Sequence, residues 1–288
     1  SECDGSQDFD MTLRLTEKAN KVYHLPKVLY FWRSHPGSVA SGIEAKTYCL
    51  DSAKKALSDH LNRIGWKGSV EDSSFASSYH IRYETEGNPM ISILIPNKDH
   101  IGELETCIGS VFDKTTYENF EIVIIENGSE EEETFAYYKQ LEAEYGEKVR
   151  IVTWNYGFNY AAINNFGAKA AKGDYLLLLN NDTEVITPDW LQEMLMFAQR
   201  EDVGVVGAMM YFGDDTIQHA GIIMGIGGTA GHSHKGLKRG SAGYLCKLAI
   251  AQDVSGVTGA CMMIAKDKYE KSGGLDEKFA VAFNDVDF

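Results

Sequence analysis

The sequence predicts an α/β fold in which a mostly parallel sheet is flanked by helices, with an N-terminal segment of helix and strand beside it. Short, continuously apolar runs such as ISILI (91–95), EIVII (121–125) and YLLLL (175–179) have the length of buried strands. Longer segments separate these runs, and after 91–95 the apolar residues Leu104 and Ile108 recur at helical spacing. Strands that are apolar on both faces and alternate with helices are typical of a parallel sheet.

The other elements of residues 90–288 continue this alternation. Further apolar runs predict strands at 149–153, 203–207 and 257–265. Helices are predicted at 130–145, at 160–171 and from Thr187-Pro188, an N-cap followed by proline at the first helical position. Residues 213–243 are rich in glycine and histidine, and we expect short strands and a mobile loop there.

Residues 1–89 do not share this rhythm. The predicted elements are a helix at DMTLRLTEKANK (10–21), a strand at KVLYFWR (27–33), a helix at 44–64 and a strand at YHIRYE (79–84). The region around the last strand is polar and serine-rich, as expected of a connector. We therefore divide the chain into residues 1–42, a helical linker at 43–89 and an α/β domain at 90–288.

The composition excludes several classes of partner. With 42 acidic against 27 basic side chains the net charge is −15, which argues against a general nucleic-acid binder because such proteins need a basic face. An acidic chain binds a phosphorylated ligand only through a local device such as a metal ion, a helix N-terminus or a few cations. No apolar run approaches the length of a membrane span, and the five cysteines are scattered without a C-x-x-C pair. Reduced thiols in a cytoplasmic protein are the natural interpretation.

Polar, amide and acidic residues follow the first four predicted strands, where open parallel sheets bind their ligands. These segments are PNKDH (96–100), ENGS (126–129), WNYGFNYAAINN (154–165) and NNDTE (180–184). Loops between strands and helices are polar in any case, so one such segment alone is a weak signal. Because all of them reach the same edge of a parallel sheet, together they predict a polar cleft.

These segments, followed by VTGACMMIA and the final FNDVDF, occur in an order that resembles family-two glycosyltransferases of the Rossmann-like GT-A fold. The resemblance covers about residues 90–288. It implies transfer of a sugar from a nucleotide-diphosphate donor, a UDP-, GDP- or dTDP-sugar, to a hydroxyl acceptor, usually with inversion and with Mn²⁺ or Mg²⁺. The charge that develops on the leaving diphosphate is the physical reason for the cation.

The setting of the reaction also comes from the resemblance alone. It implies assembly of cell-envelope polysaccharide on a glycan or lipid-linked acceptor. We accordingly expect the protein in the cytoplasm, with peripheral attachment to the inner face of the membrane as an alternative.

The resemblance assigns the metal site to Asn180 and Asp182, which stand where the family has a D-x-D motif at a strand end. Asp182 is then the main metal ligand, since hard divalent cations prefer carboxylate oxygens. Asn180 contacts either the metal or the ribose. Without the resemblance, Asn-Asn-Asp is simply a turn that leads into the next helix.

The same resemblance places a set of strand-end residues on the nucleotide-sugar donor. They are Pro96, Asn97, Lys98, Asp99, Glu126, Asn127, Asn155, Gly157, Asn159, Asn164, Asn180 and Asn181. Glu126 or Asn127 would accept hydrogen bonds from the base, and Lys98 would contact phosphate or base. Simpler alternatives are a solvated loop lysine at 98, a plain turn at Gly128, and amides that cap the following helix.

The reaction also needs a base, because an acceptor hydroxyl is a poor nucleophile until a carboxylate takes its proton. A nearby carboxylate also stabilises an oxocarbenium-like transition state. By resemblance Asp285 is this base, with Asn284 in place of the more usual Glu. Without that context, a lone Asp at this position would be a surface residue.

The pattern amide-Asp-apolar-Asp-apolar occurs twice, as Gln7–Met11 and as Asn284–Phe288. Family members continue after it with a helix, a strand and often a W-R-x-H segment, and here that continuation follows the first copy. The resemblance therefore predicts that residues 1–42 are the tail of one glycosyltransferase module. Residues 90–288 are then the body of a second module, truncated at its C-terminus.

In this interpretation Asp8 is a second catalytic base and His35 a metal ligand. We expect the tail to pack on the body as in a circular permutant, within one chain or swapped between the two chains of a dimer. Asp8 and His35 would then approach Asp182 and form a composite site. The alternative is a detached helical N-terminal piece.

Other functions remain open. The asparagine at position 180 favours a non-catalytic nucleotide-sugar-binding or scaffold module beside an active copy. A nucleotidyltransferase is less favoured, because PNKDHIGE is not a glycine-rich, basic phosphate loop. The histidines His219, His232 and His234 lie in a glycine-rich segment without a cysteine pair, which fits a loop that closes over donor or acceptor better than a zinc site.

Overall fold

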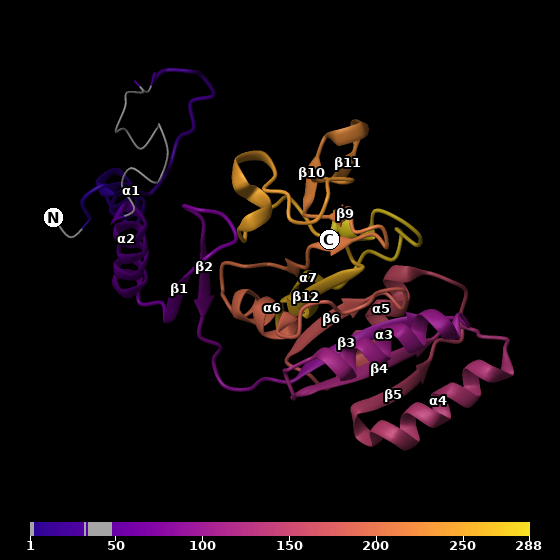
Figure 1. The fold of residues 1–288 in the computed structure, drawn as a ribbon. Helices are drawn as coiled ribbons and strands as arrows, with labels where there is room; N and C mark the ends of the chain where they lie inside the picture. The colour runs from indigo at the N-terminus through magenta and orange to yellow at the C-terminus, as the bar shows by residue number, and fades with distance from the viewer. Residues whose placement is uncertain (1–2, 32, 34–47) are drawn as a thin grey trace. The chain divides into compact units, whose positions relative to one another are not determined.

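The computed structural model describes residues 3–31, 33 and 48–288, which form two compact units (Figure 1). Unit 1 comprises Ser1–Glu84 and Gly240–Gln252, and unit 2 comprises Thr85–Arg239 and Asp253–Phe288. The division that we expected at residues 42 and 89 stays a prediction. No helix within the described ranges is both long enough and apolar enough to cross a membrane.

Unit 2 is built on a six-stranded sheet of order β5-β4-β3-β6-β12-β7. Its strands are β3 (Ile91–Asn97), β4 (Phe120–Glu126), β5 (Val149–Thr153), β6 (Tyr175–Leu179), β7 (Val206–Gly207) and β12 (Cys261–Ala265). The strands β3, β4, β5 and β6 are parallel, whereas β12 runs antiparallel to both of its neighbours. The predicted α/β fold with a mostly parallel sheet is therefore confirmed.

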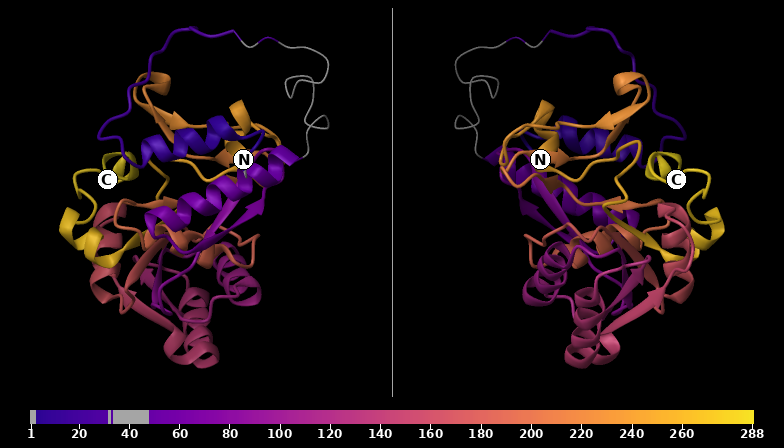
Figure 2. Two further views of the ribbon diagram at one scale, coloured as in Figure 1. Left: turned by 90° about the vertical axis from the view of Figure 1, so that its left-hand side faces the viewer. Right: turned by 90° about the vertical axis from the view of Figure 1, so that its right-hand side faces the viewer.

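Helices cover both faces of this sheet, as the turned views of Figure 2 show. One face carries α3 (Ile101–Lys114), α4 (Glu132–Tyr145) and α6 (Trp190–Ala198), and the other carries α5 (Tyr160–Ala170) and α7 (Lys266–Ser272). Successive side chains of a strand point to opposite faces, so Ile93 packs toward α3 and Leu94 toward α5. Both side chains are fully buried, which explains why the strands are apolar without alternation.

The glycine- and histidine-rich segment forms short antiparallel pairs. In one pair β8 (Met210–Tyr211) joins β9 (Ile217–His219), and in the other β10 (Ile222–Met224) joins β11 (Ala230–His232). The described part of unit 2 ends in α8 (Asn284–Asp287). Short 3-10 turns lie at η3 (Gly146–Lys148) and η4 (Ile226–Gly228).

Unit 1 holds α1 (Gln7–Thr16), α2 (Tyr48–Ile64), a hairpin of β1 (Gly68–Asp72) and β2 (Tyr79–Tyr83), and the 3-10 segment η5 (Tyr244–Ala249). Just after α1, Glu17 accepts hydrogen bonds from the Arg63 guanidinium at 2.7 Å and pairs with His60 at 2.7 Å. The bonds from Arg63, and then that from His60, lower the pKa of Glu17 to about 2. In addition, Ser73 donates to the Ala249 carbonyl at 2.6 Å, which ties η5 to unit 1.

Several local expectations were wrong. The segment 27–33 forms no strand in its described part, and its apolar side chains are exposed, Val28 by 81% and Phe31 by 86%. The helix expected from Thr187-Pro188 begins only at Trp190, after a turn in which the Trp190 N–H donates to the Thr187 carbonyl. The strand expected at 203–207 shortens to Val206–Gly207, and β1 was not foreseen.

Candidate functional site

The carboxyl ends of β3, β4 and β6 meet at one edge of the sheet, and hydrogen bonds join the residues that follow them. The Asn181 amide donates to Asn97 Oδ1 at 2.7 Å, which links the β6 loop to β3. The Asn127 N–H donates to the Asn97 carbonyl at 2.9 Å, and the Trp154 N–H donates to the Glu126 carbonyl at 2.8 Å. The structure thus brings together Asn97, Glu126, Asn127 and Asn181, as a parallel sheet requires.

Glu126 is buried, and its carboxylate accepts hydrogen bonds from the loop that follows β4 and from α4. Oε1 accepts the Ser129 N–H, and Oε2 accepts the Ser129 hydroxyl and the Tyr138 hydroxyl at 2.7 Å each. The Asn97 amide donates to the same Tyr138 oxygen at 2.9 Å. Burial, together with the neighbouring Glu126 carboxylate, raises the pKa of Tyr138. In this arrangement Glu126 shapes the loop after β4, and contact with a base stays a prediction.

Asp99 holds the start of α4 while Lys98 remains accessible. The Asp99 carboxylate accepts the N–H groups of Glu130 at 3.0 Å and Glu131 at 3.1 Å, and the Thr134 hydroxyl at 3.3 Å. The bond from the Glu131 N–H is the main cause that lowers the pKa of Asp99. The Lys98 side chain is 50% exposed and pairs with Glu130 at 3.3 Å, so it can turn toward a phosphate.

The asparagine-rich loop after β5 divides into capping and exposed residues. Asn159 is the N-cap of α5, since its Oδ1 accepts the Ala162 N–H at 3.0 Å, and its amide donates to the Glu277 carbonyl at 2.8 Å. Asn164 is fully buried and donates to the Tyr160 carbonyl at 2.9 Å. Asn155 and Gly157 are exposed, whereas Pro96 is half-buried at the end of β3.

The candidate metal ligand Asp182 is exposed in the turn after β6. Asn180, which precedes it, is fixed by its main chain: its N–H donates to the Ala260 carbonyl at 3.0 Å, and its carbonyl accepts the Thr183 hydroxyl at 2.8 Å. No cluster of three or more His, Cys, Asp or Glu side chains suited to a metal occurs among the described residues. One carboxylate with neighbouring amides fits Mg²⁺ or Mn²⁺, because such ions are bound through one or two carboxylates plus substrate phosphates.

The candidate base Asp285 lies in the first turn of α8 and is half-buried. Its Oδ2 accepts the Gly259 N–H at 3.1 Å, and the Gly259 carbonyl accepts the Tyr160 hydroxyl at 2.9 Å. Asn284, which replaces the expected Glu, is buried and donates to the Phe279 carbonyl at 3.3 Å. Asp285 is therefore held by the backbone just before β12.

Thr258, Gly259 and Ala260, which we call the 258–260 turn, connect the two predicted sites. Gly259 binds Asp285, while the next carbonyl, that of Ala260, binds the N–H of Asn180 at 3.0 Å. Sequence reasoning assigned this segment to a strand and overlooked Gly259, although a Thr-Gly-Ala sequence before an apolar run is a turn signal. A turn that bonds to partners on both sides fixes the position of Asp285 relative to that of Asn180.

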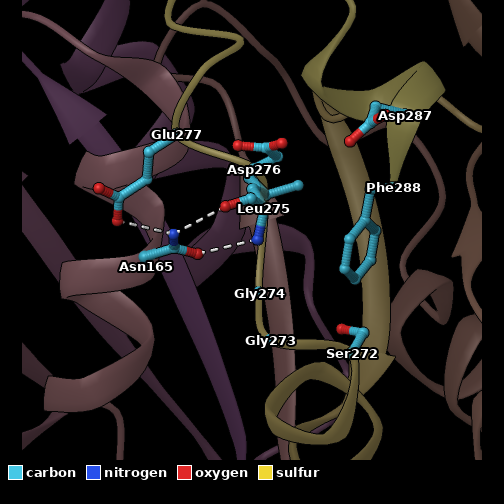
Figure 3. A pocket seen from close by; sticks show the side chains of 9 residues that line it. All are labelled: Asn165, Ser272, Gly273, Gly274, Leu275, Asp276, Glu277, Asp287 and Phe288. Atoms are coloured by element: carbon cyan, nitrogen blue, oxygen red, sulfur yellow. Dashed lines mark hydrogen bonds between the residues drawn. The ribbon is translucent and has the colours of Figure 1, made fainter.

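A hollow of about 500 Å³ lies beside α8 (Figure 3). Its lining residues are Asn165, Ser272, Gly273, Gly274, Leu275, Asp276, Glu277, Asp287 and Phe288. Asn165 shapes its wall, because its amide donates to the Leu275 carbonyl at 2.9 Å and to the Glu277 carboxylate at 3.1 Å, while its oxygen accepts the Leu275 N–H at 3.0 Å. The same short helix thus carries Asp287 at this hollow and Asp285 at the 258–260 turn.

Asp8 and His35, the two residues predicted to complete the site, belong to the N-terminal segment. Asp8 is exposed in the first turn of α1, where its Oδ1 accepts the Phe9 N–H at 2.9 Å. His35 lies outside the described residues. Their approach to Asp182 stays a prediction. The repeated pattern does have a structural counterpart, because α1 begins at Gln7 and α8 begins at Asn284, the first residue of each copy.

Comparison with known sequences gives matches along the whole chain. The sequence model for "Glycosyl transferase family 2" matches residues 92–273. An uncharacterized protein, y4gI, of Sinorhizobium fredii is 41% identical over 288 residues, and the O-antigen biosynthesis protein RfbC of Myxococcus xanthus is 39% identical over 289 residues. Each alignment covers 99% of this chain but only 32% and 22% of these relatives, respectively.

Solved structures share the fold at low sequence identity. The mannosyltransferase PcManGT from Pyrobaculum calidifontis, in complex with GDP-Man and Mn²⁺, is 14% identical with a TM-score of 0.51, over 69% of this chain and 50% of its own. GalNAc-T7 with UDP, GalNAc and Mn²⁺ is 16% identical with a TM-score of 0.56, over 74% of this chain and 42% of its own. Both likenesses concern the arrangement of the sheet and its helices.

Proposed function

The chain belongs to glycosyl transferase family 2 and is a transferase, and on that premise we propose that unit 2 moves a sugar from a nucleotide-diphosphate donor to a hydroxyl acceptor. The observation that carries this proposal is the 258–260 turn. It holds the carboxylate of Asp285 through Gly259 and the strand end before Asp182 through Ala260. Inverting sugar transfer from a nucleotide donor uses a group that accepts the proton of the acceptor hydroxyl. It also uses a site that stabilises the charge on the leaving diphosphate.

In the proposed mechanism Asp182, with Asn180 or Asn181, holds Mn²⁺ or Mg²⁺. The cation, when bound, neutralises charge on the diphosphate. Lys98, which follows the neighbouring strand β3, contributes a positive charge at the same edge of the sheet. The amides of Asn97 and Asn181, which are bonded to each other, keep the loops after β3 and β6 together. Complexes of structurally similar proteins with Mn²⁺ support this assignment.

Asp285 takes the proton of the acceptor hydroxyl as that oxygen bonds to the anomeric carbon. The bond from this carbon to the diphosphate oxygen breaks in the same step, and the diphosphate leaves with the electron pair. The Gly259 N–H holds one carboxylate oxygen, Oδ2, and so sets the direction in which the other oxygen points. Attack from the side opposite to the leaving group gives inversion.

The pathway proposed is polysaccharide assembly on a glycan or lipid-linked acceptor. Its support is the similarity to a protein named for O-antigen biosynthesis, of which this chain spans about a fifth. The donor classes proposed are UDP-, GDP- and dTDP-sugars, and GDP-Man and UDP occur in the complexes of the structural neighbours.

The repeated start of α1 and α8 supports a further proposal about module organisation. Residues 1–42 are the counterpart of a glycosyltransferase tail, with Asp8 equivalent to Asp285 and His35 a metal ligand of that module. Asn180 supports the competing function, a nucleotide-sugar-binding scaffold beside an active copy, because an amide is a weaker metal ligand than a carboxylate.

The test is a panel of UDP-, GDP- and dTDP-sugars with Mn²⁺ or with EDTA, scored for nucleotide release and for nucleotide affinity. We expect Mn²⁺-dependent binding that Asp182→Ala abolishes and Glu184→Ala retains, since Glu184 is a neighbouring carboxylate already paired with Lys114 at 2.8 Å. Asp285→Asn should keep binding and lower turnover by about 10²- to 10⁴-fold, because the amide still accepts the Gly259 N–H but takes no proton. Binding without turnover in the wild-type protein would favour the scaffold.

A further inference from the structure

The transfer proposed above gives no role to a pair of histidines, buried His219 and exposed His232. His219, at the end of β9, is 1% exposed, and its Nδ1 lies 2.8 Å from Nδ1 of His232 in β11. The two rings meet edge to face, with centroids 5.1 Å apart and planes at 84°. A buried polar ring of this kind is retained where both of its nitrogens have partners.

The partners of His219 determine which of its nitrogens carries the proton. Nε2 accepts the N–H of Gly221 at 3.2 Å and that of Thr258 at 3.4 Å. A nitrogen that accepts backbone N–H groups has no proton of its own, so the proton of the neutral ring lies on Nδ1. Nδ1 of His219 therefore donates to Nδ1 of His232, and His232 carries its proton on the outward nitrogen, Nε2.

This arrangement does not fit zinc between the two rings. Zinc–nitrogen bonds of about 2.0–2.1 Å hold two nitrogens roughly 3.3 Å apart in a tetrahedral site. The two Nδ1 atoms lie closer, at 2.8 Å, which is the length of a hydrogen bond. Nor does any described part of the chain bring three suitable ligands together.

The bond from Thr258 connects the histidine pair to the proposed transfer site. Thr258 begins the 258–260 turn, whose next N–H, from Gly259, binds Asp285, and whose Ala260 carbonyl binds Asn180. A second attachment lies beside it, because the Ile222 N–H in β10 donates to the Gly256 carbonyl at 2.8 Å. Hydrogen bonds thus attach both β9, through His219, and β10, through Ile222, to the segment 256–258.

We propose that His219 is a positioning residue of the transferase, which holds the 258–260 turn, and through it Asp285, by accepting the Thr258 N–H. His232 accepts the hydrogen bond from Nδ1 of His219 and thereby leaves Nε2 of His219 free to accept the Thr258 N–H. The inference rests on the proposed role of Asp285 as base. It assigns His219 and His232 a structural link to the site in place of a zinc site.

The experiment compares three variants of the full chain. His219→Leu removes the acceptor, His219→Gln supplies an amide oxygen in its place, and His232→Leu removes a partner on the surface and is expected to fold. Hydrogen exchange is measured at the Thr258 and Gly259 amides, and kcat and the donor KM are measured with Mn²⁺. His100→Leu is the exchange control, because the His100 side chain is 73% exposed and His100 stands at the N-cap of α3.

We expect His219→Leu to speed exchange at Thr258 by about fivefold to tenfold, the worth of one hydrogen bond. It should lower kcat by about 100-fold with little change in donor KM, since a displaced base affects the chemical step. His219→Gln should restore most of both, and His232→Leu should show a smaller change of the same sign.

Two results would overturn the positioning role. The first is an unchanged rate of Thr258 amide exchange in both His219→Leu and His232→Leu. The second is an equal loss of kcat in His219→Gln and in His219→Leu. If His219→Leu fails to fold, His219→Gln and His232→Leu decide the question through exchange relative to wild type. Failure of the proposed function looks different. In that case the wild-type protein shows no transfer, while the exchange rates still report whether His219 holds the turn.

Discussion

The buried ring of His219 predicts how the stability of unit 2 depends on pH. Burial first, and the neighbouring His232 second, lower the pKa of His219 from its usual 6.5 to about 4, although Asp285 acts in the opposite direction. The folded protein therefore keeps the ring neutral where the unfolded chain protonates it. Stability from this group is complete above about pH 6.5 and is lost as the pH falls from about 6.5 toward about 4.

The magnitude follows from these two pKa values. At pH 5 the unfolded ring is almost fully protonated and the folded ring is mostly neutral, so about 2 kcal/mol of stability is lost relative to pH 7, at about 1.4 kcal/mol per pKa unit. Urea unfolding at pH 7 and pH 5, followed by tryptophan fluorescence, measures this loss. In His219→Gln, which does not titrate, the difference between the two pH values should shrink by about 2 kcal/mol.

The matched control is His100→Gln. The His100 side chain is 73% exposed, so the same substitution there should leave the pH dependence as in wild type. An equal difference between pH 7 and pH 5 in wild type and in His219→Gln would refute the reasoning. It would mean that His219 is solvated, or that it loses its partners, in the folded protein.

Two further predictions concern packing around the strand ends. Gly167→Ala should destabilise unit 2 by about 1–3 kcal/mol, because the new Cβ would lie 2.8 Å from Ile125 Cδ1 where α5 crosses β4. Gly109→Ala in α3 has no neighbour within 4 Å and should be neutral or stabilising by up to about 1 kcal/mol, so equal effects in urea unfolding would contradict this account. Tyr138→Phe removes a buried donor to Glu126 and should cost about 1–3 kcal/mol by the same assay; unchanged stability would show that this carboxylate does not need the tyrosine.

The central sheet was predictable because its inner strands are buried on both faces, as the burial of nearly all residues of β3 and β6 shows. The runs 149–153 and 175–179 match β5 and β6 at both ends, although most of β5, at the edge of the sheet, is only half-buried. The segment 27–33 is also rich in apolar residues but forms no strand in its described part. An apolar composition shows that burial of a segment would be favourable in free energy. It does not show which other part of the chain packs against the segment.

The site was predictable in position but not in detail. Parallel topology brings Asn97, Glu126 and Asn181 to one edge, and the sequence shows that topology. The hydrogen-bond partners that occupy Glu126 and Asp99 come from Ser129, Tyr138 and the start of α4, and spacing alone does not reveal them. For the same reason the 258–260 turn was assigned to a strand: its N–H groups bond to His219 and Asp285, which are distant in sequence.

The asparagine at position 180 leads to different expectations for nucleotide binding by a catalytic module and by a scaffold. Its backbone is held by Ala260, so the turn after β6 keeps its shape whichever side chain stands there. The strand end then offers one carboxylate, Asp182, and a cation with a single protein carboxylate needs phosphate oxygens to complete its shell. Cation and nucleotide should therefore bind with positive coupling, each raising the affinity for the other by the same factor. A scaffold that binds nucleotide through loop amides alone has no such coupling, so the titration with and without Mn²⁺ distinguishes the two before any acceptor is known.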